Sequence, residues 1–275
     1  MRAALSIVAL LLATALHAAD APKPLRVLLI TGGVGHDHAA QKDILKKGIE
    51  SRANVVVEQL HTEGNLSDPP LPILGNPDYA KGFDVVIHDA MTPGIYRAPT
   101  VRAVLKPHLV DGIPAVVLHV GASAYRSGQN DRTTAPREAG FMTWTEFTGV
   151  IVHGHGGSAP IAISFADKTH PATRGLADWT TMTEELYHQV EVFPSARVLA
   201  KGTLQLKDKP EEAVVAWCNE LKLANGKTVR AFSTSLGHRN ETVADPRYLD
   251  LVTNGLLWAA DKLDENGKPR EGYAK

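Results

Sequence analysis

Histidines follow three apolar runs of this chain, each near the point where the run gives way to glycine and other small residues. The runs are Leu25–Thr31 before His36, Ala115–Leu118 before His119, and Val229–Thr234 before His238. An imidazole can bind a metal ion and can transfer protons near neutral pH. If the runs are parallel strands, their carboxyl ends meet at one edge of a sheet, where ligands bind. The pattern therefore predicts a pocket lined by histidines.

We predict that His119 and His238 form the central acid–base pair of this pocket. With His36 they also form a candidate site for a divalent metal such as zinc, which neutral imidazoles suit. The chain has no His-x-x-x-His spacing, so acid–base and metal roles both stay open. It also lacks a complete dinucleotide fingerprint, a P-loop and a Gly-x-Ser-x-Gly elbow, which argues against nicotinamide binding and serine hydrolysis.

Four further residues are predicted to bind substrate: Gly33, His155, Glu185 and Tyr187. Gly33 lies in a glycine turn that can cradle a phosphate or a sugar hydroxyl. Glu185 and Tyr187 belong to a polar cluster whose carboxylates and phenol can hold sugar hydroxyls, and Trp144 or Trp179 could stack on a sugar face. The alternative without a function is that the cluster forms a solvated helix end. For His153 and His155, which flank Gly154, the alternative is a mobile glycine loop.

The elements that must position these residues alternate between strand-like and helical patterns over residues 25–119. This rhythm predicts an α/β fold, flavodoxin-like, with a mostly parallel central sheet and helices on both faces. Residues 120–158 lack an apolar period and are expected to form a long functional loop. Asn225-Gly226 predicts a turn between two paired strands. We expect a helix over Pro246–Leu263 and a frayed charged tail over 265–275.

The N-terminal residues have the layout of a secretory signal peptide, with cleavage near Ala18 or Ala19. A membrane anchor is the alternative; after cleavage we expect no membrane span. Residues 20–264 then form one domain, and the protein is expected to be periplasmic or secreted. The formal net charge of −1 and the lack of long basic runs argue against nucleic acid as a partner. Cys218 is the only cysteine, so no intrachain disulfide can form, and we expect it to be a core residue.

Pieces of the chain, in order, resemble the ThuA-like family, named for a trehalose utilisation protein. They span about residues 25–260 and include Val27–Gly33, Leu118–Ser123, His170–Leu176, Glu184–Tyr187, Ser235–His238 and Asn254–Ala259. The resemblance implies a fold similar to class I glutamine amidotransferases. In those enzymes a cysteine follows the central strand, and His119 stands at what looks like that place. Because imidazole cannot form the same thioester, we expect no amidotransferase activity.

The family is linked to sugar catabolism, often beside proteins that handle 3-keto glycosides. The resemblance therefore implies a small carbohydrate substrate and a reaction by elimination or hydrolysis, assisted by histidine acid–base groups or by a metal. Two rivals remain. One is a non-catalytic sugar-binding or accessory protein. Scattered histidines would favour this rival, whereas clustered histidines would favour an enzyme. The other is ordinary glycoside hydrolysis by a pair of facing carboxylates, for which Glu184 and Glu185 are the candidates.

Overall fold

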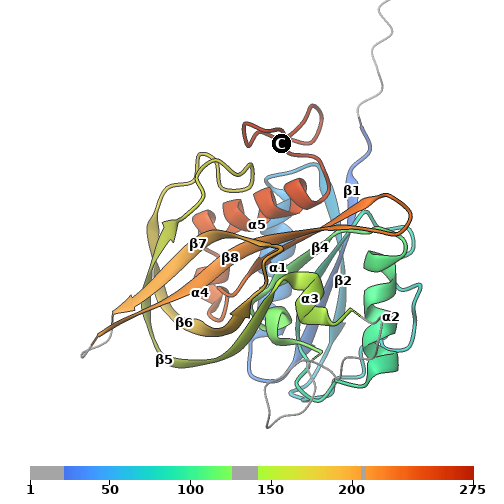
Figure 1. Ribbon diagram of the computed structural model, residues 1–275, viewed down its shortest axis with the longest axis horizontal. Helices are drawn as coiled ribbons and strands as arrows, with labels where there is room; N and C mark the ends of the chain where they lie inside the picture. The colour runs from blue at the N-terminus through green and yellow to red at the C-terminus, as the bar shows by residue number, and fades with distance from the viewer. Residues whose placement is uncertain (1–21, 126–141, 206–208) are drawn as a thin grey trace, which may run out of the picture.

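A single mixed sheet organises the computed structural model, which describes residues 22–125, 142–205 and 209–275. The sheet has nine strands in the order β2-β1-β3-β4-β9-β8-β7-β5-β6 (Figure 1). The expected signal peptide, residues 1–19, lies outside the described residues, as does the middle of the expected 120–158 loop.

Five neighbouring strands are parallel, as the alternating pattern of the sequence predicts. They are β1 (Leu25–Gly33), β2 (Val55–Thr62), β3 (Val85–Met91), β4 (Ala115–Leu118) and β9 (Thr228–Thr234). Along β1, Val27 and Leu29 enter one core cluster while Leu28 and Ile30 enter another. Because both faces of this strand are covered, it reads as a continuous apolar run.

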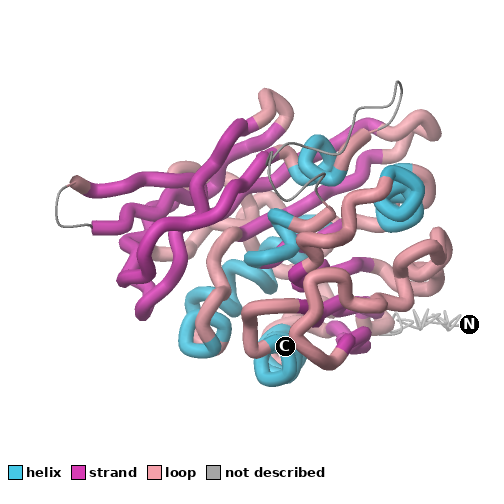
Figure 2. Tube along the Cα trace, turned by 90° about the horizontal axis from the view of Figure 1, so that it is seen from below, coloured by secondary structure: helices cyan, strands magenta, loops and turns pink. Residues whose placement is uncertain are grey.

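Helices cover both faces of the sheet, as Figures 1 and 2 show. Residues of α1 (His38–Glu50) and α5 (Pro246–Ala259) pack in the first core cluster, and residues of α2 (Ala98–Leu109) and α3 (Trp144–Thr148) pack in the second. Two short elements follow strand ends: the 3-10 helix η1 (His119–Ser123) after β4 and α4 (Asn240–Val243) after β9. The predicted fold class, α/β with a parallel core, is confirmed.

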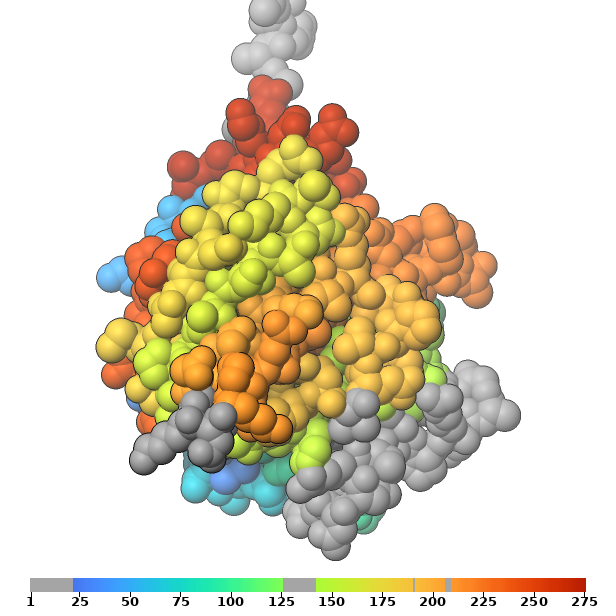
Figure 3. All heavy atoms as spheres, turned by 60° about the vertical axis from the view of Figure 1, so that its left-hand side comes forward, coloured from blue at the N-terminus to red at the C-terminus, as the bar shows by residue number. Residues whose placement is uncertain are grey.

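The other half of the sheet is antiparallel, and the sequence pattern predicts only part of it. It contains β5 (Val150–Phe165), β6 (Trp179–Val192), β7 (Ala196–Gln205) and β8 (Pro210–Lys222). The hairpin of β8 and β9 around Gly226, whose φ is 81°, is confirmed. The expected long loop is wrong for residues 144–158, which form α3 and the first part of β5. These strands, coloured yellow-green to orange, make up most of the face in Figure 3.

The C-terminal segment packs against the start of the parallel half, so the expectation that it frays is wrong. The backbone N–H of Asn54 donates to the carbonyl of Tyr273 over 3.0 Å, and Ala53 forms a β-bridge with Ala274. The helix before it ends at Ala259 rather than at Leu263. Among the described residues, no helix is both long and apolar enough to cross a membrane.

Candidate active site

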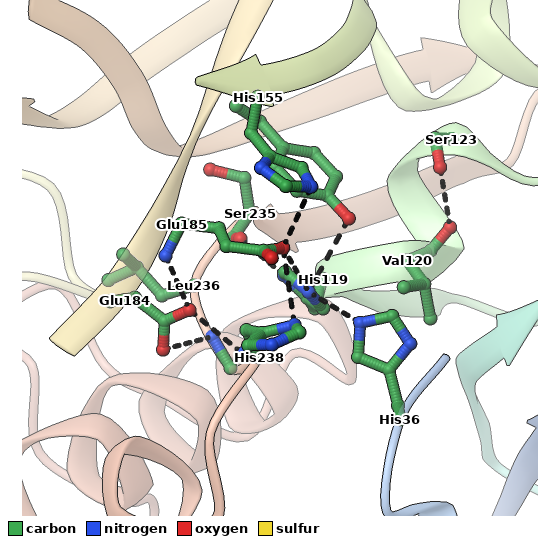
Figure 4. A network of polar contacts seen from close by, with 12 residues as sticks. His36, His119, Val120, Ser123, His155, Glu184, Glu185, Ser235, Leu236 and His238 are labelled. Carbon is green, nitrogen blue, oxygen red and sulfur yellow. Dashed lines mark hydrogen bonds and ion pairs between the residues drawn. The ribbon is translucent and has the colours of Figure 1, made fainter. Parts of the chain in front are cut away.

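His36, His119 and His238 meet at the carboxyl edge of the parallel strands (Figure 4). His36 lies in the loop after β1, His119 begins η1 after β4, and His238 lies in the loop after β9. The centroid of the His36 ring is 4.9 Å from that of His119 and 4.8 Å from that of His238, and the last two rings are 5.5 Å apart. Three sequence-distant strand ends thus bring together the three imidazoles that the sequence analysis singled out.

Glu185 joins these imidazoles from β6, in the antiparallel half of the sheet. Its Oε2 lies 3.2 Å from Nδ1 of His238 and 3.7 Å from Nε2 of His119. His36, His119, Glu185 and His238 each offer one ligand atom, and all four atoms lie within 4.8 Å of one another. In a tetrahedral zinc site with bonds of about 2.1 Å, ligand atoms are about 3.4 Å apart. The four side chains therefore have the chemistry and the spacing of a metal site.

The orientation of two imidazole rings is fixed by backbone carbonyls. Nδ1 of His119 lies 2.7 Å from the carbonyl oxygen of Ser235, and Nδ1 of His36 lies 3.1 Å from that of Val34. Because a carbonyl oxygen only accepts, each Nδ1 must carry the proton. In a neutral ring Nε2 is then a lone-pair acceptor, which is the form that ligates a metal.

These two Nε2 atoms face each other at 3.0 Å. Burial lowers the pKa of both rings, that of His119 well below its usual range, and each further charged imidazole nearby lowers it more. A proton shared between the two lone pairs is therefore disfavoured, although two unprotonated acceptors repel at this distance. A bound cation removes the repulsion, and the donor set fits one.

The remaining two groups have a similar electrostatic setting. Burial, together with the neighbouring His36, lowers the pKa of His238 to about 4. Burial raises the pKa of the Glu185 carboxyl, whereas the nearby His155 lowers it. At neutral pH His238 is therefore uncharged and able to ligate, and a cation would favour the ionised form of Glu185.

Glu184 holds two of these groups in place without entering the site. Its side chain is fully buried, and its carboxylate accepts hydrogen bonds from the backbone N–H groups of Glu185 (2.9 Å), Gly237 (3.3 Å) and His238 (3.0 Å). Among the described residues, Glu184 and Glu185 do not face each other across a cavity, which argues against hydrolysis by a carboxylate pair. The sequence reveals the acidic pair but not which member anchors the loop.

Gln41 gives the same loop a second attachment that sequence reasoning missed. Its Nε2 donates to the carbonyl of Gly237 over 3.2 Å and to that of His238 over 2.9 Å. Its position in α1 gives no signal in the sequence, because a polar helical residue usually faces solvent. The His238 loop is therefore fixed from both sides by buried polar side chains.

The residues predicted to bind substrate line two cavities beside the four ligands. Gly33 lines a cavity of about 750 Å³, where a Cβ would lie 2.1 Å from the carbonyl oxygen of Met91, so only glycine allows this close approach. His155, Glu185 and Tyr187 line a second cavity of about 350 Å³. The hydroxyl of Tyr187 is 3.4 Å from Nε2 of His119, and Nε2 of His155 is 3.3 Å from Oε2 of Glu185.

Several alternatives weighed from the sequence are settled by these positions. The Glu184–His188 cluster lies on β6 rather than at a helix end. A register shift between His153 and His155, with Gly154 at φ 40°, breaks the alternation that would have pointed both rings the same way, and only His155 lines the cavity. His38, the first residue of α1, is only 3% exposed and lies against Thr31.

The aromatic and thiol groups considered from the sequence lie in the core. Trp144 is buried and donates to the carbonyl of Gly121 over 2.9 Å, and Trp179 is covered by the guanidinium of Arg247. Neither lines the two cavities, so the expected stacking on a sugar is wrong for both. Cys218 is buried in the first core cluster, with His170 at 3.5 Å, which confirms the expected core role. Burial raises the pKa of its thiol to about 12.

One comparison with known proteins identifies the family of this chain. A family model described as ThuA, trehalose utilisation, matches residues 26–259. A solved structure described as a putative ThuA-like protein from Parabacteroides merdae matches with a TM-score of 0.60 at 20% sequence identity. The match covers 86% of this chain and 90% of that one. This likeness concerns the fold. No curated protein sequence matches the chain significantly.

Two further solved structures have lower scores. One is described as a putative GMP synthase protein from Thermoplasma acidophilum, with a TM-score of 0.47 at 12% identity, over 87% of this chain and 96% of that one. The other is a glutamine amidotransferase from Thermotoga maritima, with a TM-score of 0.40 at 13% identity, over 86% and 96% respectively.

Proposed function

Because this chain belongs to the ThuA family of trehalose utilisation, we propose that it is a carbohydrate-processing enzyme with a divalent metal, such as zinc, held by His36, His119, Glu185 and His238. The observation that carries the proposal is the pair of Nε2 lone pairs facing each other at 3.0 Å, each ring fixed by a carbonyl at its Nδ1. Clustered imidazoles also favour an enzyme over a non-catalytic binding protein.

The substrate class that suits this site is a 3-keto glycoside. Its ketone acidifies the C–H bond at C2, so a base can take that proton. The electron pair left at C2 then forms the C1=C2 double bond while the bond from C1 to the glycosidic oxygen breaks, and the departing oxygen takes up a proton. Addition of water to the product completes a net hydrolysis. A bound metal would supply stabilisation of the negative charge that develops on the ketone oxygen.

His155 is the residue best placed to move the proton. Its Nδ1 lies 2.9 Å from the carbonyl of Gly156 and so carries a proton, which leaves Nε2 as the basic atom. That Nε2 lies beside Glu185, and the side chain is 36% exposed, so a substrate can reach it. In this proposal His119 and His238 serve as ligands, and the hydroxyl of Tyr187, 3.4 Å from Nε2 of His119, lies beside the departing glycosidic oxygen.

We also propose that the protein is exported. The support is the signal-like layout of residues 1–19. The single cysteine favours a bacterial periplasm over a small extracellular module held by disulfides. Mass spectrometry of protein from a periplasmic fraction is expected to find a new N-terminus near Ala18 or Ala19. An intact Met1 on the mature protein would contradict export by signal cleavage.

The function is tested with purified protein, its metal content and a panel of 3-keto glucosides. We expect about one equivalent of divalent metal per chain and turnover that is abolished by a chelator and restored by zinc. Full turnover by metal-free protein would overturn the metal role. Binding of sugars without turnover of any keto glycoside in the metal-loaded protein would instead support the non-catalytic rival.

A further inference from the structure

Two cavities of different character meet at the candidate metal site. The larger, of about 750 Å³, and the smaller, of about 350 Å³, share Gly35, His36 and His238 and no other residue. Because these residues line both cavities, a molecule that occupies both would lie against His36 and His238. This arrangement suits a substrate with two parts, one in each cavity, joined by the bond that reacts.

The residues that belong only to the larger cavity are rich in hydrogen-bonding groups. They include Asp37, Glu63, Asn65, Arg239 and Asn240. Carboxylates, amides and a guanidinium in one open hollow suit a ligand with many hydroxyl groups, because each hydroxyl both donates and accepts. This cavity is therefore the place for the sugar ring.

The surface that lines the smaller cavity is mostly apolar, although Ser123, His155 and Glu185 also belong to its wall. Val34, Met91 and the ring of Tyr187 contribute to its wall, and the hydroxyl of Ser123 is directed to the carbonyl of Val120 at 3.1 Å. The rings of His155 and Tyr187 line this cavity and are nearly parallel, with an interplanar angle of 12°. A flat ring can stack beside such parallel ring planes. A Cβ at Gly154 would meet no atom within 4 Å, so the cavity is open on that side as well.

We infer that the substrate is a glycoside with a flat apolar aglycone, which occupies the smaller cavity while the sugar occupies the larger one. The inference rests on the proposed function, because it places the glycosidic bond that is cleaved beside the four proposed metal ligands. The departing oxygen would lie beside His155, on the aglycone side, where the proton taken from C2 can be returned to it. A second sugar in the smaller cavity would find fewer hydrogen-bonding partners there than in the larger one.

The inference is tested by binding, separately from turnover. Zinc-loaded protein is titrated calorimetrically with the methyl and p-nitrophenyl glucopyranosides of both anomers and with trehalose. We expect a p-nitrophenyl glucoside to bind at least tenfold more tightly than the matching methyl glucoside. Equal affinities, tighter binding of trehalose, or no binding of any of these glycosides would overturn the inference.

Two variants of the smaller cavity localise the effect. Met91→Ala removes apolar wall, and Gly154→Asn fills the open side with a residue that tolerates positive φ. Each is expected to reduce the aryl preference to less than threefold while methyl glucoside binding persists. The matched control is Met182→Ala, because Met182 is 64% exposed on β6 and lines neither cavity. A preference that survives both cavity variants would also overturn the inference.

Failure of this inference can be told apart from failure of the proposed function. Zinc-dependent turnover of 3-keto glucosides with no aryl preference would leave the metal enzyme standing and remove the apolar aglycone. An aryl preference that depends on Met91, in a protein whose turnover is independent of metal, would support the apolar aglycone and contradict the metal enzyme.

Discussion

Three features constrain His119: its backbone conformation, the hydrogen bond of its Nδ1 and the contacts of its Nε2. One substitution can remove the last and keep the first two. Its φ of 39° lies in the left-handed region, which asparagine tolerates better than most residues. The amide nitrogen of an asparagine can take the place of Nδ1 opposite the carbonyl of Ser235, whereas nothing in asparagine replaces Nε2. His119→Asn therefore removes the ligand atom and preserves the turn.

We predict that His119→Asn changes the free energy of unfolding by less than about 2 kcal/mol. Zinc affinity is expected to fall at least tenfold, and turnover of keto glycosides to disappear. Denaturant titration and metal analysis measure the two effects. His170→Asn is the matched control, because His170 is buried beside Cys218, away from the site, and should leave zinc affinity unchanged. A variant that unfolds as it loses metal would make His119 a structural residue.

Glu184 tests whether an anchor outside the ligand group sets the geometry of the site. In Glu184→Gln an amide N–H replaces one carboxylate oxygen, so one backbone donor is left facing another donor. We expect a loss of about 1–3 kcal/mol in the free energy of unfolding. Zinc affinity should also fall, but less than in Glu185→Gln, which alters a ligand directly. Calorimetric zinc titration of both variants gives the comparison, and an unchanged affinity in Glu184→Gln would refute the anchoring role.

At the scale of single elements, the sequence is informative where a histidine follows a buried strand. It is uninformative where buried and exposed side chains alternate irregularly along a strand. The buried runs before His36, His119 and His238 predict their convergence because parallel strands end at one edge. In contrast, β6 combines exposed and buried polar residues with several register shifts against β5. Its pattern matches neither helix nor strand, so Glu185 could be chosen as a polar site residue but not as a neighbour of three imidazoles.

The turn after β5 gives a prediction about pH and stability. Burial alone would raise the pKa of Asp167, but hydrogen bonds from Thr169 and the ion pair with Arg197 outweigh it and lower the pKa to about 2. The unfolded value is about 3.9. Because the folded pKa is lower, this carboxylate stabilises the fold above about pH 4, and its contribution is lost as the pH falls toward 2.

We therefore predict that Asp167→Asn lowers the free energy of unfolding by about 1 kcal/mol at pH 7, a value that allows for solvent screening of the ion pair. The difference from the wild-type protein should shrink to about a third of that value at pH 2.5 and approach zero only below pH 2. Urea titrations of both proteins at several pH values measure it. A difference that stays constant between pH 7 and pH 2.5 would show that the ion pair does not titrate with folding.

At the scale of the whole molecule, the four candidate ligands connect the two halves of the sheet. His36 and His119 follow strands of the parallel half, His238 follows β9 at the boundary, and Glu185 lies on β6 at the far edge. The βαβ rhythm predicts the parallel half, yet it contains no information about how the antiparallel half of the same sheet brings β6 to the site. That contact is long-range, and no local pattern specifies it.

A cation bound by all four ligands should therefore stabilise the complete fold. Since the unfolded chain does not hold these residues together, zinc at one hundred times its dissociation constant is expected to add about 2.7 kcal/mol to the free energy of unfolding. For a domain of this size that corresponds to a rise of roughly 5–10 °C in Tm. Thermal unfolding of chelator-treated protein, with and without zinc, measures the shift. His119→Asn supplies the control: because its zinc affinity is expected to be at least tenfold weaker, the same zinc concentration should add no more than about 1.4 kcal/mol. If zinc raises the Tm of the wild-type protein and of His119→Asn equally, the metal binds elsewhere and the four side chains are not its site.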